Sequence, residues 1–146
     1  MKKIIPILSI LMLLSFGGSK EEIIMIPKDA IRFRVIANSD TKEDQNIKMT
    51  VKKGVQKELY ESVKEASSIE EARKITKEKL GEYQSLIEKI LVEENQIDTK
   101  VTLNYGQNYF PEKSYQGVLY PEGYYESLVV TLGDGLGKNW WCVLFP

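Results

Sequence analysis

Side chains able to do covalent chemistry are scarce in this chain. It contains no histidine, which excludes a Ser-His-Asp or Cys-His nucleophile and a His-ligated zinc site. Its single cysteine, Cys142, cannot form an internal disulfide or a multi-thiolate metal site. The apolar run around Cys142 predicts a buried, inert thiol, with pairing to another chain or loss of a former partner as the alternatives. The sequence therefore predicts no catalytic residue, no metal site and no cofactor.

Carboxylates and glycines are the remaining candidates for chemistry. An acidic pair such as Glu93 with Glu94 could serve a glycosidase, which needs two carboxyl groups across a cleft, but no spacing singles this pair out. Gly133, Gly135 and Gly137 are spaced like a phosphate-binding loop. Such a loop opens into a helix, whereas an apolar strand is predicted to follow here. These glycines are interpreted as a hairpin turn.

Two short stretches carry residues suited to binding a partner. In the first, polar and charged side chains gather where a predicted strand meets a predicted helix, so a rigid scaffold can present them. In the second, two tryptophans are adjacent and must point to opposite faces of a strand, so one of them is an exposed interface anchor unless another element covers it. The predicted partner-binding residues are Arg34, Asn38, Asp40, Asp44, Trp140 and Trp141.

The first stretch must be positioned by a strand and a helix. Residues 31–37 alternate between apolar and charged side chains, as in a strand with one buried face. Asp40 lies three residues before Glu43, which is the spacing of a helix cap. The helix is predicted to end at Ser67 and Ser68, with Gly54 marking a point of close packing. Its apolar stripe consists of Ile47, Val51, Val55, Leu59 and Val63.

A second helix and several strands follow. Ser68 and Glu71 repeat the cap spacing and predict a helix that continues to Glu93, forming a hairpin with the first helix. Beyond it, the apolar period changes to two. Strands are predicted near residues 97–105, 118–120, 127–132 and 140–145, a loop at 106–111, and a hairpin between the last two strands. The fold class is α+β, with a mostly antiparallel sheet covered on one face by a two-helix hairpin.

Length and charge limit the classes of function. The 146 residues suit one domain, and 20 basic against 21 acidic residues give no broad positive field for binding nucleic acid. Lys2 and Lys3 precede an apolar run that is too short to span a bilayer and is followed by small residues. Residues 1–19 are predicted to be a signal peptide, 20–29 a linker and 30–146 the domain. An uncleaved anchor is the alternative for the leader.

Two motifs resemble the stage II sporulation protein R family. The first runs from Arg34 through Ala37, Asn38, Ser39 and Asp40 to Gln45. The second joins Leu119–Ser127, which includes Tyr-Pro-Glu-Gly-Tyr-Tyr, to Gly137–Pro146, which includes Asn-Trp-Trp-Cys. The resemblance covers nearly all of the chain after the leader. Family members usually continue past this last proline with a second cysteine, so a truncated C-terminal end is an expectation.

The resemblance implies a signalling protein of endospore-forming bacteria that is not itself an enzyme. It implies export by the forespore into the space between the two membranes that separate it from the mother cell. The implied partner is a membrane-embedded aspartic protease of the mother cell, which matures the sigma-E precursor, and no small-molecule substrate or nucleic acid is implied. A secreted cell-wall hydrolase using carboxylates and an adhesive surface domain are the alternatives.

Overall fold

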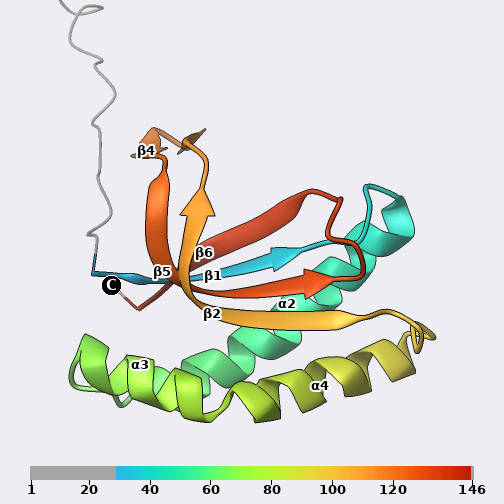
Figure 1. Cartoon of the computed structure of the whole chain (residues 1–146), viewed down its shortest axis with the longest axis horizontal. Coiled ribbons are helices and arrows are strands. Elements are labelled where there is room, and N and C mark those ends of the chain that lie inside the picture. The colour runs from blue at the N-terminus through green and yellow to red at the C-terminus, as the bar shows by residue number, and fades with distance from the viewer. Residues whose placement is uncertain (1–28, 146) are drawn as a thin grey trace, which may run out of the picture.

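The computed structural model describes residues 29–145, in which three helices cover one side of a four-stranded sheet (Figure 1). The predicted α+β class is confirmed. A separate two-stranded hairpin lies on the side of the sheet away from the helices. The elements in chain order are β1 (Ile31–Ile36), α2 (Lys42–Val63), α3 (Ile69–Glu78), α4 (Leu80–Glu93), β2 (Val101–Phe110), β3 (Lys113–Tyr115), β4 (Val118–Tyr120), β5 (Gly123–Leu132) and β6 (Asn139–Phe145).

Helix α2 is held by its apolar stripe, and all five predicted positions of the stripe are buried. A Cβ on Gly54 would come within 2.7 Å of Ile90 Cδ1, so this glycine allows the close packing that the sequence predicts. The predicted cap at Asp40 is wrong. The hydroxyl of Thr41 accepts the amide of Asp44 instead, because the Asp40 carboxylate accepts the amide of Lys138 on another loop.

The second predicted helix is divided into α3 and α4 at Lys79. Ser68 caps α3 as predicted, and its hydroxyl accepts the amide of Glu71. The two halves pack against different parts of the core, which explains the change of direction. Ala72 of α3 joins a small cluster with Ile31 and Val63, whereas the buried side chains of α4 belong to the main core.

The sheet has the order β2-β5-β1-β6, and β1 runs parallel to β5 and antiparallel to β6. The predicted hairpin between the last two strands is therefore wrong, because β1 is inserted between them. Ile31, Phe33 and Val35 are fully buried on the helix side, so β1 gains from having a neighbour on both edges. The glycine-rich segment after β5 is a crossover past the end of β1.

The strand predicted from residue 97 begins at Val101, because residues 97 and 98 form a turn after α4, and β5 begins at Gly123, earlier than predicted. The expected loop at 106–111 is wrong, because β2 continues to Phe110 and pairs with β5 over its whole length. Phe110 is buried, and the ring of Tyr109 packs edge-on against Tyr124 at 5.6 Å. Backbone pairing with β5 continues through Gly106 to Phe110, so the polar segment around Gly106 is part of the strand.

A buried carboxylate joins the helix layer to the sheet. Glu126 of β5 accepts two hydrogen bonds from Arg73 of α3, at 2.5 and 2.8 Å, and one from the hydroxyl of Tyr105 at 2.5 Å. The Arg73 guanidinium holds the pKa of Glu126 below its usual value, since it favours the charged form. The same carboxylate and the burial of the phenol raise the pKa of Tyr105.

Acid is expected to destabilise the fold through Glu126. Because its folded-state pKa lies below the usual 4.5, its contribution is complete above that pH and disappears as pH falls through the folded-state value. Glu126→Gln should lower the free energy of unfolding at pH 7 by about 1–3 kcal/mol. It should also flatten the pH dependence below pH 4.5, as measured by urea unfolding across that range. Glu58→Gln on an exposed face of α2 is the matched control, and an equal loss there would contradict the assignment.

The predicted signal peptide at 1–19 and most of the predicted linker lie outside the described residues. Between residues 29 and 145, no helix combines the length and the apolar character needed to cross a bilayer.

Candidate binding site on strand β6

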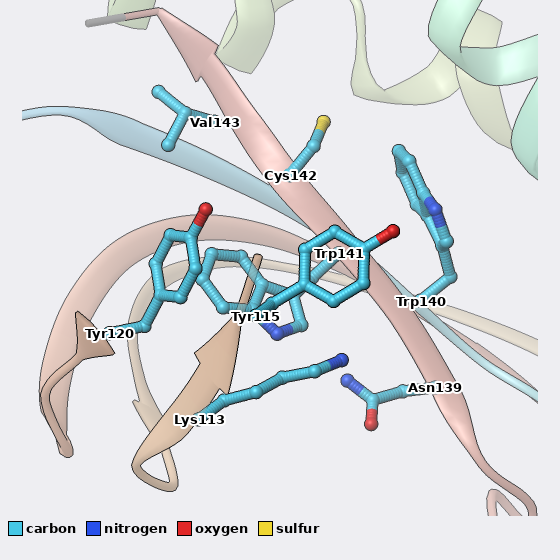
Figure 2. A pocket seen from close by; sticks show the side chains of 8 residues that line it. All are labelled: Lys113, Tyr115, Tyr120, Asn139, Trp140, Trp141, Cys142 and Val143. Carbon is cyan, nitrogen blue, oxygen red and sulfur yellow. The ribbon is translucent and has the colours of Figure 1, made fainter. Parts of the chain in front are cut away.

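A groove of about 470 Å³ lies between β6 and the β3–β4 hairpin (Figure 2). We call it the β6 groove. Most of its walls are apolar or aromatic side chains, and one basic residue stands on the hairpin side. The residues that line it are Lys113, Tyr115, Tyr120, Asn139, Trp140, Trp141, Cys142 and Val143.

The two adjacent tryptophans point to opposite faces of the sheet, as predicted. Trp140 packs on the helix side, with its ring 6.1 Å from that of Phe33 and the ammonium group of Lys52 4.4 Å from its centroid. Trp141 packs on the other side, 4.7 Å from the ring of Tyr120. Both tryptophans are half-buried, so each contributes to the fold and leaves surface for a partner.

Cys142 lies between packed residues of β6 and is half-buried. The apolar run predicts a fully buried thiol, but β6 is an edge strand and all seven of its residues are partly exposed. Burial nevertheless raises the pKa of the Cys142 thiol to about 11. The thiol is therefore protonated at neutral pH and is a weak nucleophile, in agreement with the sequence analysis.

An aromatic box on the face away from the helices encloses Arg32. This side chain is 1% exposed, and its guanidinium carbon lies 3.6 Å from the ring centroid of Tyr125, 4.7 Å from Trp141 and 5.1 Å from Phe110. Its Nη1 and Nη2 have no hydrogen-bond partner among residues 29–145, so the ring faces are what stabilise the charge. The Arg32 guanidinium packs against the ring of Trp141 from inside the protein and does not reach solvent.

Arg34, predicted to contact a partner, lies next to this box and is half-buried. Its Nη1 donates to the carbonyl oxygen of Tyr109 at 3.2 Å, and its guanidinium carbon is 5.3 Å from the ring of Phe110. It also pairs across the sheet with Trp141. The structure thus brings Arg34 and Trp141 together on one face.

The other predicted contacts, Asn38, Asp40 and Asp44, meet in a network between two loops. The side chain of Asn38 donates to Asp44 at 2.9 Å and accepts the amide of Asp134 at the same distance. Asp40 accepts the amide of Lys138 at 2.7 Å. Hydrogen bonds from the Ser39 hydroxyl and from Asn38 lower the pKa of Asp44. Asn38 and Asp40 hold the crossover that leads into β6, and Asp44 orients Asn38, which gives all three a structural role.

The glycines of the crossover are explained by the same contact. A Cβ on Gly133 would overlap the side chain of Asn38, and Gly133 also has a φ of 56°. A Cβ on Gly137 would overlap the carbonyl group of Ser39. The spacing that resembles a phosphate loop therefore reflects close packing of two loops.

The hairpin side of the groove was not predicted as part of the site. Lys113, Tyr115 and Tyr120 reach the groove because β3 and β4 form a tight hairpin. Its turn is Gln116-Gly117, in which both residues have positive φ. This is the geometry of a two-residue hairpin loop, so a Gln-Gly pair between Tyr115 and Val118 was the signal available in the sequence.

The charge of the β6 groove is positive. Lys113 lines the groove, and no acidic residue of the part that the structure describes, 29–145, does. The acidic pair considered for hydrolysis, Glu93 and Glu94, lies at the end of α4, and residues 29–145 contain no group of three potential ligands that could hold a metal ion. The groove is thus suited to holding a chain segment that offers apolar side chains and a carboxylate.

Comparisons with known proteins give a consistent result. The family model described as stage II sporulation protein R matches residues 27–146. The stage II sporulation protein R of Bacillus subtilis (strain 168) is 40% identical over 128 residues, which are 88% of this chain and 57% of that protein. The chain thus spans a little over half the length of this relative. No solved structure matches the chain.

Proposed function

Because the chain belongs to the stage II sporulation protein R family, we propose that it is an exported signal between the two cells of the sporangium. In this proposal the forespore exports it into the intermembrane space, where it binds a membrane-embedded aspartic protease of the mother cell. Binding activates the protease, which then matures the sigma-E precursor. The chain itself makes and breaks no covalent bond.

The observation that supports binding is the pair of half-exposed tryptophans beside the β6 groove. Tryptophan is enriched at binding hot spots, since a large rigid ring gains contact area at little entropic cost. Trp141 is held in place by Arg32 at 4.7 Å and Tyr120 at 4.7 Å, so its orientation is fixed before a partner arrives. A ligand of this kind activates an enzyme by binding its active conformation more tightly than its inactive one.

Deletion of the gene tests the proposal. The uncut sigma-E precursor should accumulate during sporulation, because the protease stays in its inactive conformation, and a blot for the precursor measures this. Re-expression of the full chain should restore processing, whereas a chain lacking residues 2–19 should restore it only when an unrelated export signal is attached. Normal processing in the deletion strain would contradict the proposal. Release of fragments from peptidoglycan by the purified chain would favour a hydrolase instead.

A further inference from the structure

The β6 groove follows the edge of a strand. Its floor consists of five consecutive residues, Asn139–Val143, whose side chains alternate between the two faces of the sheet. Trp140 packs on the helix side and Trp141 on the other side, yet both line the same groove (Figure 2). A groove that contacts side chains on both faces of the sheet must pass along the backbone edge of β6. The groove therefore exposes that edge to an incoming chain.

Strand β6 carries no charged residue or proline, and the one irregularity in its pairing with β1 lies between Val143 and Phe145, beyond the groove residues. It is the last strand in the order β2-β5-β1-β6, so half of its backbone amides and carbonyls point away from β1. Natural edges are blunted by charged side chains or proline, but β6 reads Asn-Trp-Trp-Cys-Val-Leu-Phe. An uncharged, apolar edge of this length is a template for pairing with another strand.

Charge indicates what kind of strand fits. Lys113 stands on the groove wall beside Asn139, as Figure 2 shows, and Lys52 lies over the ring of Trp140 on the helix side. A second copy of this chain would offer no carboxylate from its own β6. A segment with a carboxylate at the end next to Lys113 would neutralise this charge.

We propose that β6 receives an extended segment of the partner protein as a fifth strand of the sheet. The segment pairs with the backbone edge of β6, places apolar side chains beside Trp140 and Trp141, and carries an acidic residue next to Lys113. This inference rests on the proposed function, in which the partner is the mother-cell protease. Main-chain pairing supplies affinity, and the tryptophans with Lys113 supply specificity.

Hydrogen–deuterium exchange of the full chain, with and without the detergent-solubilised protease, tests the strand pairing. Binding should slow exchange of the amides in residues 139–143, since pairing occupies the outward-facing N–H groups. Exchange in β2, the opposite edge of the sheet, should stay unchanged. Slowed exchange in 139–143 of the chain alone, growing with its concentration, would identify a second copy as the occupant and overturn the proposal.

A charge reversal tests the carboxylate. Lys113→Glu should weaken binding to the solubilised protease by about tenfold or more, and Lys113→Arg should retain it. Lys89→Glu makes the same charge change on an exposed face of α4 and is the matched control. If Lys113→Glu still binds the protease and exchange in residues 139–143 is not slowed, the strand-pairing inference is wrong while the proposed function still holds. Absence of binding by the unaltered chain, together with normal processing in the deletion strain, would overturn the proposed function.

Discussion

Replacing Gly137 with alanine is expected to lower the free energy of unfolding by roughly 2–4 kcal/mol. The added Cβ would overlap the carbonyl group of Ser39, which is backbone and cannot rotate away. The amide of Gly137 also donates to the carbonyl of Ala37 at 2.9 Å, so any shift that relieves the overlap breaks the contact between the two loops. Urea unfolding followed by circular dichroism measures the change.

The matched control for this substitution is Gly81→Ala in α4. Nothing lies within 4 Å of a Cβ at Gly81, so alanine should fit and raise stability by up to about 1 kcal/mol through helix propensity. Opposite signs for the two glycines are expected. A Gly137→Ala protein as stable as the unaltered chain would contradict the close packing of the crossover on the β1–α2 loop.

Replacing Arg32 with glutamate is expected to leave the chain largely unfolded, with a loss of more than about 4 kcal/mol. The substitution puts a carboxylate against the negative faces of three aromatic rings, in a buried position that disfavours its charge. Arg32→Lys keeps the charge but loses the flat stacking surface, so a smaller loss of about 1–2 kcal/mol is expected. Near-ultraviolet circular dichroism reports the packing of the tryptophan and tyrosine rings directly.

An exposed lysine provides the control for Arg32. Lys53→Glu makes the same change of charge on the solvent side of α2 and should alter stability by no more than about 0.5 kcal/mol. If Arg32→Glu unfolded with the same midpoint as Lys53→Glu, the aromatic box would not be the environment of this guanidinium. Restored stability in Arg32→Lys relative to Arg32→Glu would confirm that the site requires a cation.

The helices and the alternating strands could be predicted because their signals are local. The apolar period of α2, the cap at Ser68 and the opposite orientation of Trp140 and Trp141 each depend on residues within a few positions of one another. The break at Lys79 could not be predicted, because it depends on which core cluster each half of the helix meets. Local patterns do not carry that information.

The position of β1 and the burial of Arg32 could not be predicted either, because both depend on contacts with residues far away in the chain. An arginine in an alternating strand predicts a solvent face, and only the curl of β2 and β5 brings Phe110 and Tyr125 over it. Three predicted contact residues, Asn38, Asp40 and Asp44, were chosen for their exposed polar chemistry. The structure shows Asn38 and Asp40 bonded to the crossover before β6, a partner more than 90 residues away in the chain, and Asp44 bonded to Asn38.

The central place of β1 sets the order in which this chain can fold. Strand β1 is the first element of the described chain, and its two neighbours, β5 and β6, are the last two. The helices depend on nearby contacts, but the middle of the sheet cannot close until β6 has left the ribosome. Such high contact order slows folding. Formation of the complete sheet is therefore a late event, which follows synthesis of the whole described chain.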